Sequence, residues 1–317
     1  MKTAAPVAPP VLVEVHRPRG AWAGVGGKAA ALGALTKPKV AALVLVTVAA
    51  GFLLGARHAP AGATAAATPT LVLTLIGTGL VAAGASAWNQ VMERVRDGRM
   101  RRTAGRPLPR GLLAPAEAML FGTALAVAGL ALLALGPHLA AARVALATFG
   151  LYVLAYTPLK ARTTLNTAVG AVPGALPPVI GWAAATGTLG IEALALFLIV
   201  FLWQFPHFLA IAWIYREDYA RAGYKMLPAV DPRGARTGRQ AVVYALALVP
   251  VGLLPATIGL AGPWYFVGAL GLGLYYLACA VRFWSDVTDA TARGLLRASF
   301  LYLPAILWLL LANPLPA

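Results

Sequence analysis

The chain has few charged residues and almost no cysteine. Only 11% of its 317 residues are charged, 60% are hydrophobic, and the mean hydropathy is +0.76. The single cysteine, Cys279, lies inside an apolar run, so it supports neither a disulfide framework nor a cysteine-based metal site. The first 37 residues lack an apolar stretch before a small-residue cleavage site, so we expect no signal peptide there. The apolar runs that follow are too many and too long for a soluble core.

Nine of these runs are long enough to cross a membrane, which takes about 17–25 residues. Backbone groups in lipid must form their hydrogen bonds internally, so each run is predicted to be a helix. We therefore predict an all-α, polytopic integral membrane protein, with a flexible cytoplasmic tail over residues 1–37 and one transmembrane domain over residues 38–317. The predicted spans are residues 40–56, 71–93, 115–135, 139–157, 165–186, 191–215, 239–260, 264–284 and 295–312.

Acidic residues are especially scarce, with 10 Asp and Glu against 26 Lys and Arg and a formal net charge of +16. The basic residues gather in the N-terminal tail and in the loops that join even-numbered spans to odd-numbered ones. This asymmetry predicts a cytoplasmic N-terminus and a non-cytoplasmic C-terminus. Basic loops between apolar runs favour the lipid bilayer and a phosphate-bearing ligand as partners, and not nucleic acid.

The second run ends in a polar cluster with helical spacing. Asn89, Glu93 and Asp97 recur every four residues, so on a helix they line one face. Carboxylates at the end of a membrane helix are costly unless something binds them. Seven arginines lie between residues 94 and 110. Two carboxylates, an amide and this basic loop together favour a hard cation and a phosphate-bearing substrate.

A second cluster lies in and after the sixth span. Gln204 and His207 are polar groups inside an apolar run, which indicates function by default. The alternative is that each is hydrogen bonded to a neighbouring helix. His207 and Asp218 are eleven positions apart, which predicts one shared helix face. For Asp218 and its neighbours Arg216 and Glu217, the alternative is a solvated helix end with an internal ion pair.

A third cluster joins the fourth and fifth spans. Tyr156 and Lys160 stand four residues apart at the predicted cytoplasmic edge, and Arg162 follows. Beside a diphosphate, Lys160 would supply a compact positive charge, and the planar guanidinium of Arg162 would donate two parallel hydrogen bonds. Both basic residues are also explained as topology signals. All three clusters fall on the same predicted membrane face, which favours a single site there.

The three clusters together resemble the UbiA superfamily of intramembrane prenyltransferases. The pattern Asn89-x3-Glu93-x3-Asp97, the pair Tyr156-x3-Lys160 and an acidic motif after the sixth span carry this resemblance. Longer strings are similar to the protohaem IX farnesyltransferase (haem O synthase) family within it: Leu-Thr-Lys-Pro, Met-Arg-Arg-Thr-x-x-Arg-Pro-Leu-Pro, Tyr-Thr-Pro-Leu-Lys and Trp-Gln-Phe-Pro-His with Tyr-Arg-Glu-Asp-Tyr. The resemblance runs from about residue 35 to residue 313, and the Gln-Phe-Pro-His and Tyr-Arg-Glu-Asp-Tyr strings are the part that points to haem.

The resemblance implies a UbiA-type bundle, a Mg²⁺ cofactor, and farnesyl diphosphate and haem B as substrates. It implies that the following residues hold the metal: Asn89, Glu93, Asp97, Glu217 and Asp218. It implies diphosphate contacts for Arg102, Arg106, Lys160, Arg162 and Arg216. It implies haem contacts for Trp203, Gln204 and His207, with the imidazole available to ligate iron. The catalytic set is then Asn89, Glu93, Asp97, Tyr156, Lys160 and Asp218.

One departure from the superfamily concerns the second motif. Most members carry a second Asp-x3-Asp pair, whereas here His207 comes first and Glu217 and Asp218 follow, so the second-metal ligands stay open. The resemblance also implies a bacterial cytoplasmic membrane with the site toward the cytoplasm. Haem A synthase or an oxidase assembly factor is the partner class that it implies for the product.

Two alternatives remain at this point. One is a prenyltransferase of the same superfamily that acts on another acceptor, such as a quinone precursor or a chlorophyllide-type tetrapyrrole. The other is a membrane transporter, because polar residues inside spans also mark substrate paths. A transporter predicts midplane ionisable groups and inverted repeats. Here the acidic residues gather at one face and no convincing repeat is visible.

Overall fold

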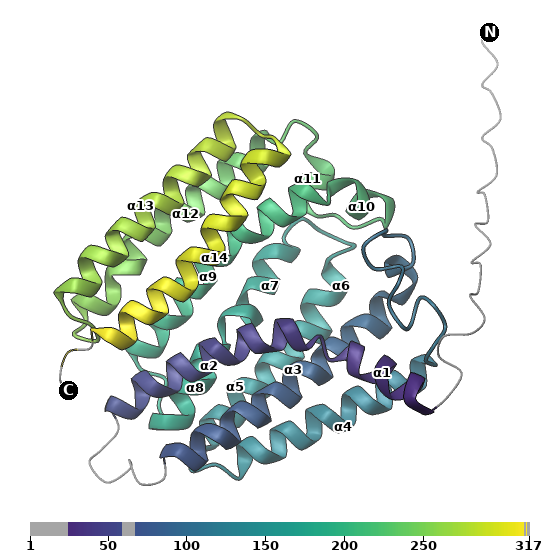
Figure 1. Ribbon diagram of the computed structural model, residues 1–317, viewed down its shortest axis with the longest axis horizontal. Coiled ribbons are helices and arrows are strands. Elements are labelled where there is room, and N and C mark those ends of the chain that lie inside the picture. Colours follow the sequence, from purple (N-terminus) through teal and green to yellow (C-terminus); the bar gives the residue numbers. More distant parts are fainter. Residues whose placement is uncertain (1–24, 59–66, 314, 316–317) are drawn as a thin grey trace.

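The computed structural model describes residues 25–58, 67–313 and 315, and in these residues the secondary structure is helical (Figure 1). The elements are α1 (Val25–Leu35), α2 (Pro38–His58), α3 (Ala67–Asp97), α4 (Pro115–Ala134), α5 (Leu139–Gly150), η2 (Leu151–Tyr156), α6 (Thr157–Leu159), α7 (Asn166–Ala175), α8 (Pro177–Thr186), α9 (Ile191–Ile214), α10 (Arg216–Arg221), α11 (Leu227–Val230), α12 (Ala235–Thr257), α13 (Pro263–Ser285) and α14 (Asp289–Ala312).

Nine helical segments within the described ranges are long and apolar enough to cross a membrane, which confirms the predicted all-α polytopic fold. The fourth comprises α5, η2 and α6, and the fifth comprises α7 and α8. Large apolar side chains remain exposed on their outer faces, as at Leu120, Leu154 and Trp308. In lipid such side chains are in a matching environment, so their exposure fits a membrane bundle.

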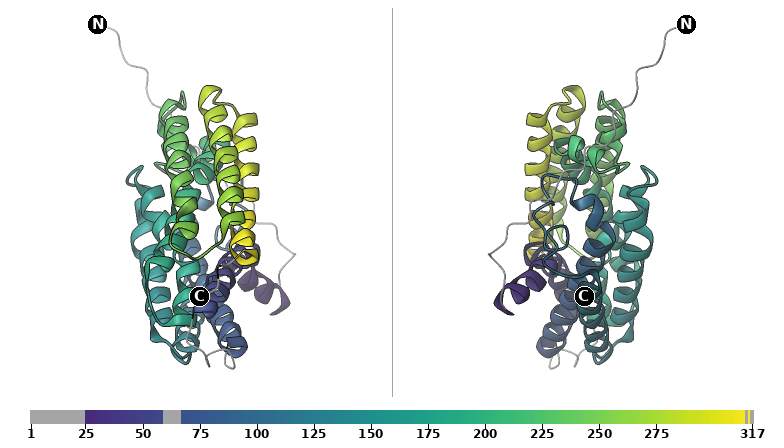
Figure 2. Two further views of the ribbon diagram at one scale, coloured as in Figure 1. Left: turned by 90° about the vertical axis from the view of Figure 1, so that its left-hand side faces the viewer. Right: turned by 90° about the vertical axis from the view of Figure 1, so that its right-hand side faces the viewer.

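The spans form two groups (Figures 1 and 2). Helices α12, α13 and α14 pack in sequence on one side, and α2, α3, α4, α5 and α8 pack on the other. Helix α9 joins the groups, because it packs on α12 and α14 and also on α7 and α8. The site described below lies at the end of the bundle where α3 finishes and α10 and α11 begin.

Glycines let α3 and α4 approach closely. A Cβ atom on Gly84 would lie 2.5 Å from the carbonyl oxygen of Gly122, and one on Gly129 would lie 2.5 Å from that of Gly77. Small residues at such crossings allow backbone contact between membrane helices, where the hydrophobic effect contributes little. This tight pairing packs the middle of α3 closely against α4.

The segment predicted as a tail is partly helical. Helix α1 packs on α3 and α4, and Lys28 forms a 2.7 Å ion pair with Glu117. Residues 1–24, which make up the rest of that predicted tail, lie outside the described residues. Lys37 separates α1 from α2 and has a left-handed backbone with φ of 48°. A non-glycine residue is uncommon there and points to a functional constraint.

Candidate active site

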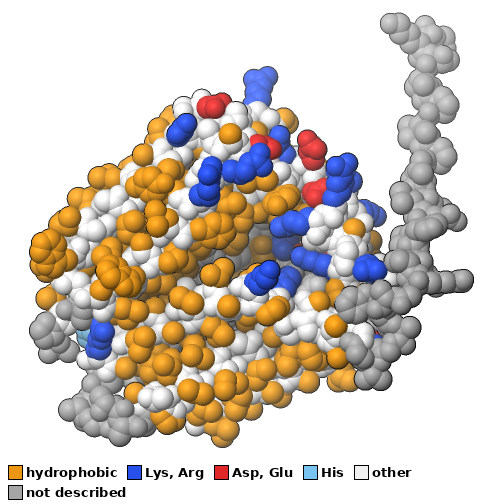
Figure 3. Space-filling model, viewed as in Figure 1, with side chains coloured by type: hydrophobic (Ala, Val, Ile, Leu, Met, Phe, Trp, Pro, Cys, Tyr) orange, Lys and Arg blue, Asp and Glu red, His pale blue; other side chains and the backbone are white. Residues whose placement is uncertain are grey.

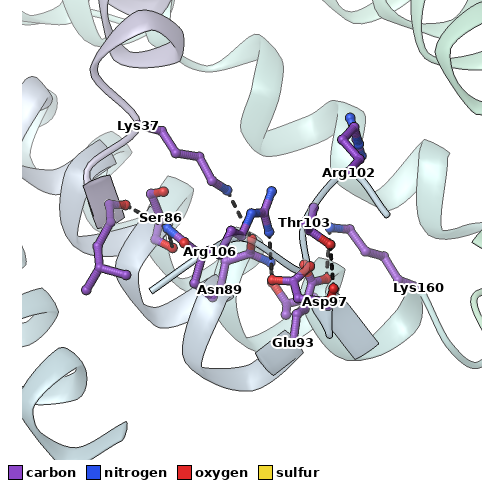
Figure 4. Close-up of polar contacts among 12 residues, drawn as sticks. Lys37, Ser86, Asn89, Glu93, Asp97, Arg102, Thr103, Arg106 and Lys160 are labelled. Atoms are coloured by element: carbon purple, nitrogen blue, oxygen red, sulfur yellow. Dashed lines mark hydrogen bonds and ion pairs between the residues drawn. The ribbon is translucent and has the colours of Figure 1, made fainter. Parts of the chain in front are cut away.

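The last turns of α3 present Asn89, Glu93 and Asp97 on one face, as their spacing predicts (Figure 4). All three side chains are buried. Each has a cationic partner from elsewhere in the chain. The Glu93 carboxylate lies 2.9 Å from Lys160 Nζ, the Asp97 carboxylate lies 2.7 Å from Arg106 Nη1, and Lys37 Nζ donates to Asn89 Oδ1 at 3.4 Å.

The pKa values of the two lysines shift in opposite directions because their surroundings differ. Burial lowers the pKa of Lys160, but the Glu93 carboxylate outweighs burial and holds that pKa well above its ordinary value. Burial, followed by the positive charges of Arg106 and Lys160, lowers the pKa of Lys37 to about 7. An anion placed between these groups would favour the charged form of Lys37. The arrangement is therefore suited to a strongly anionic ligand.

Tyr156 and Lys160 are placed by an irregular part of the fourth span. Residues 151–156 form a π-helical segment, a feature found frequently at functional sites. The Lys160 ammonium sits 4.6 Å from the centre of the Tyr156 ring. Thr157 ties the segment to α3, because its hydroxyl accepts a hydrogen bond from the Asn89 amide. A Cβ on Gly170 would overlap the Tyr156 ring, so glycine leaves room for it.

The loop after α3 brings its arginines over the carboxylates. Arg106 pairs with Asp97, and Thr103 Oγ1 donates to the Asp97 carbonyl at 2.8 Å. Arg102 reaches the α9–α10 junction, where its guanidinium stacks on Tyr215 at 4.7 Å and donates to the Tyr219 hydroxyl at 3.2 Å. Figure 3 shows Lys and Arg side chains gathered around a hollow near this end of the molecule.

Two cavities meet at this cluster. A polar one of about 160 Å³ is lined by the α3 carboxylates and amide together with Lys160, Tyr219 and Tyr224. An apolar one of about 360 Å³ runs between α2, α3, α5 and the α7–α8 segment. Four residues line both cavities: Lys37, Arg102, Arg106 and Tyr152. A ligand with an anionic head and an apolar tail would fit across them.

The other predicted anion and metal contacts lie outside the polar cavity. Arg162 is exposed, and Arg216 forms a 2.7 Å ion pair with Asp289 of α14. Asp218 lies 3.3 Å from Arg221 and accepts from the Arg102 backbone N–H at 3.4 Å. Glu217 is exposed. Neither acidic residue lines the cavity that holds Asp97.

His207 and Asp218 do not share a helix face, contrary to the sequence expectation. Helix α9 ends at Ile214, Tyr215 leaves the helical conformation, and Asp218 belongs to α10. His207 instead faces α14. Its Nδ1 lies 2.8 Å from Ser299 Oγ, and that hydroxyl donates to the Leu296 carbonyl. Because Ser299 Oγ donates its only proton to that carbonyl, it can only accept from His207. Nδ1 of the imidazole therefore carries a proton and donates, and Nε2 carries the lone pair.

The neighbours of His207 face different helices. Trp203 stacks on the His207 ring at 4.9 Å and donates its indole N–H to the Ser299 carbonyl. Gln204 points to α7, where its amide donates to the Ala171 carbonyl at 3.2 Å. A Cβ on Gly174 would overlap the Gln204 amide, so glycine makes room for this position of the amide. Trp203 and His207 therefore form one group, and Gln204 joins α9 to α7.

Sequence reasoning did not place Lys37, Tyr152, Thr157, Tyr224 or Ser299 in the site. The Lys37-Pro38 pair belongs to one of the strings that carry the family resemblance, and this was the available signal. The direction of the Lys37 side chain depends on the left-handed backbone of this residue between α1 and α2, which the spacing of residues in the sequence does not reveal. The other four act through contacts between segments far apart in the sequence.

Comparison with known proteins identifies relatives over most of the chain. The sequence profile of the UbiA prenyltransferase family matches residues 44–303. The chain is 50% identical to a protoheme IX farnesyltransferase of Solibacter usitatus over 282 residues, which cover 88% of this chain and 97% of that one. It is 42% identical to the enzyme of that name from Myxococcus xanthus, with 89% and 94% covered.

Solved structures share the fold at low sequence identity. A digeranylgeranylglyceryl phosphate synthase aligns with a TM-score of 0.74 at 17% identity, covering 90% of this chain and 98% of that one. A UbiA homologue from Archaeoglobus fulgidus, solved with DMAPP and Mg²⁺, aligns with a TM-score of 0.61 at 18% identity, covering 88% and 98%. At these identities the structural likeness concerns the fold alone.

Proposed function

Because the chain belongs to the UbiA prenyltransferase family, we propose that it transfers the farnesyl group of farnesyl diphosphate to a vinyl group of protohaem IX (haem B), with addition of water. The products are haem O and diphosphate. The observation that carries this proposal is the junction of a buried, charged cavity with an apolar one. Relatives named protoheme IX farnesyltransferase, among them one that is 50% identical, support the choice of haem as acceptor.

The residues of the polar cavity fit Mg²⁺. Asn89, Glu93 and Asp97 offer one amide oxygen and two carboxylates, and Mg²⁺ prefers oxygen ligands. Among the described residues no group of three or more His, Cys, Asp and Glu gathers, so Mg²⁺ held here would take its further ligands from substrate phosphate oxygens and water. Mg²⁺ commonly binds in this way, with one or two carboxylates. When bound, it would neutralise the charge on the leaving diphosphate.

The cations around the carboxylates would hold the diphosphate. Lys160 and Arg106 already pair with Glu93 and Asp97, and Lys37 sits at the junction with the apolar cavity. Arg102 lines both cavities. The farnesyl chain would then extend along α3 into the apolar cavity, past Val81 and Phe149. Its C1 atom would lie near Tyr152, whose ring lines both spaces.

The reaction needs little acid–base chemistry from the protein. The C1–O bond of farnesyl diphosphate breaks and both electrons leave with the diphosphate, which the basic residues stabilise. The terminal vinyl carbon of haem forms a bond to C1, leaving a cation on the carbon next to the porphyrin. Water adds there and releases a proton, giving a hydroxyl group. The apolar walls exclude other nucleophiles from the allylic cation.

We assign haem contact to the group formed by Trp203 and His207. Ser299 fixes the imidazole so that Nε2 keeps its lone pair, the form that ligates iron. Gln204 would contribute by holding α7, and with it the apolar cavity, against α9. Asp218 and Glu217 stay as second-motif candidates, and Asp218 reaches the arginine loop through the Arg102 backbone.

We also propose that this site faces the cytoplasm of a bacterial cell. The loops at its end of the bundle carry most of the Lys and Arg, which remain on the cytoplasmic side. An odd number of spans then places the C-terminus on the other side. An oxidase assembly factor or haem A synthase would receive the product within the membrane.

An acceptor panel tests the proposal. Purified protein is supplied with farnesyl diphosphate and Mg²⁺, and with haem B, a chlorophyllide or a quinone precursor. We expect a farnesylated product from haem B alone, and its loss when Mg²⁺ is chelated. Product from another acceptor and none from haem B would replace haem in the proposal while keeping prenyl transfer. No product with any acceptor would refute prenyl transfer by this chain.

A further inference from the structure

One residue that lines the polar cavity carries a hydroxyl group without a partner among the described residues. Tyr224, in the loop between α10 and α11, is 4% exposed and lines the cavity together with Glu93, Asp97 and Lys160. Its hydroxyl oxygen is buried and forms no hydrogen bond within the described part of the chain. Buried polar groups are normally hydrogen bonded, so an unpartnered hydroxyl on a residue that lines a cavity indicates a ligand.

The backbone on both sides of Tyr224 is fixed. Gly223 adopts a left-handed conformation with φ of 73°, which turns the chain back after α10. The Tyr224 N–H then donates to the Tyr219 carbonyl at 3.0 Å, and the Lys225 N–H donates to the Lys160 carbonyl at 2.9 Å. Tyr224 is thereby tied to the residue whose ammonium pairs with Glu93.

The ring is held as firmly as the backbone. It meets the Tyr219 ring edge-on at 6.0 Å, and the Arg96 guanidinium sits 5.7 Å from its centre. The hydroxyl groups of Tyr219 and Tyr224 differ in their hydrogen bonding. Tyr219 accepts a hydrogen bond from Arg102, so its hydroxyl ties the loops together. The Tyr224 hydroxyl has no such partner in the described part of the chain.

The hydroxyl of Tyr224 can act only as a neutral group. Burial, and after it the Glu93 carboxylate, raises the pKa of Tyr224 above its ordinary value. The group therefore keeps its proton at neutral pH and can donate a hydrogen bond. Around it the cavity supplies ammonium and guanidinium donors and two carboxylates. An oxygen-rich anion bound to those cations would supply the hydrogen-bond acceptor that the Tyr224 hydroxyl lacks.

We infer that Tyr224 donates a hydrogen bond to the diphosphate of the prenyl substrate and is a catalytic residue of this site. The inference rests on the proposed function, because it takes the diphosphate as the occupant of the polar cavity. As the C1–O bond breaks, both electrons pass to the diphosphate oxygen and its negative charge grows. A donor fixed beforehand then stabilises the leaving group more than the intact substrate.

Tyr224→Phe tests the inference, because it removes the hydroxyl and keeps the ring. Tyr302→Phe is the matched control, since the buried Tyr302 hydroxyl on α14 also has no partner among the described residues, but Tyr302 does not line the polar cavity. The full-length variants are compared with the original protein in lipid nanodiscs. The readouts are binding of inorganic diphosphate with Mg²⁺, steady-state kinetics with farnesyl diphosphate and haem B, and the melting temperature.

We expect Tyr224→Phe to weaken diphosphate binding and lower kcat/KM for farnesyl diphosphate by about tenfold to a hundredfold, the range for a hydrogen bond to a charged group. The KM for haem B and the melting temperature should stay unchanged, and Tyr302→Phe should change none of these. Diphosphate binding by Tyr224→Phe equal to that of the original protein would overturn the inference. So would a melting temperature several degrees lower, because the hydroxyl would then be structural. An original protein that binds no diphosphate would overturn the proposed function as well.

Discussion

Replacing Asp97 with asparagine separates its role in binding a cation from its role in the fold. The change keeps the size of the side chain and an oxygen that can accept from Arg106, but it removes the negative charge. The Asp97 side chain is buried, whereas that of its partner Arg106 is 25% exposed. Because water reaches the arginine, the loss of stability should be below the 3–5 kcal/mol of a fully buried pair, at about 1–2 kcal/mol.

The loss of activity should be larger than the loss of stability. Residues that only support metal ligands contribute roughly 10- to 100-fold, so a direct anionic ligand should contribute about a hundredfold or more. A hundredfold loss of rate corresponds to about 2.7 kcal/mol of transition-state stabilisation. Additional Mg²⁺ should restore part of the rate if the substitution acts through metal affinity. The midpoint of a Mg²⁺ titration should therefore shift to higher concentration.

The assay is farnesyl transfer to haem B by the purified variant over a Mg²⁺ titration, with thermal unfolding in parallel. Glu117→Gln is the control, because it removes a carboxylate from another 2.7 Å ion pair, with Lys28, away from both cavities. The control should have normal turnover. Near-normal turnover of Asp97→Asn at saturating Mg²⁺ would show that this reasoning about the first motif is wrong.

Three further predictions follow from the site and its orientation. Arg106→Ala should raise the KM for farnesyl diphosphate more than that for haem B, and equal changes in both would assign the arginine to topology. His207→Ala should weaken haem binding and shift the Soret band of the haem-loaded protein, with a smaller shift for Ser299→Ala; an unchanged spectrum would remove His207 as an axial ligand. Topology reporters fused after Pro232 and after Ala317 should respond as cytoplasmic and non-cytoplasmic respectively, and a reversed response at either site would contradict the orientation.

The parts of the site that could be predicted from the sequence depend on local spacing. Asn89, Glu93 and Asp97 lie on one helix at intervals of four, so their shared face follows from helix geometry. The nine spans found among the described residues follow from apolar length. The same reasoning failed for His207 and Asp218, because it assumed one continuous helix and α9 ends at Ile214.

The remaining parts depend on which segments pack together, and spacing carries no information on this. Trp203 and Gln204 are adjacent in the sequence, yet they contact α14 and α7 respectively. Lys37 itself has the left-handed backbone conformation that turns the chain before α2, and from this position its ammonium reaches Asn89. Tyr224 lines the cavity because the turn at Gly223 and the hydrogen bond from the Lys225 N–H to the Lys160 carbonyl place it there.

Labelled water provides the most direct test of the central claim that this chain farnesylates haem B, with farnesyl diphosphate bound across the two joined cavities. Purified protein is incubated with haem B, farnesyl diphosphate and Mg²⁺ in ¹⁸O-water, and the porphyrin product is analysed by mass spectrometry. The account predicts a haem that has gained one farnesyl group and one ¹⁸O-labelled hydroxyl, with release of diphosphate. A haem of unchanged mass, or a product that carries the farnesyl group without the labelled oxygen, would contradict it.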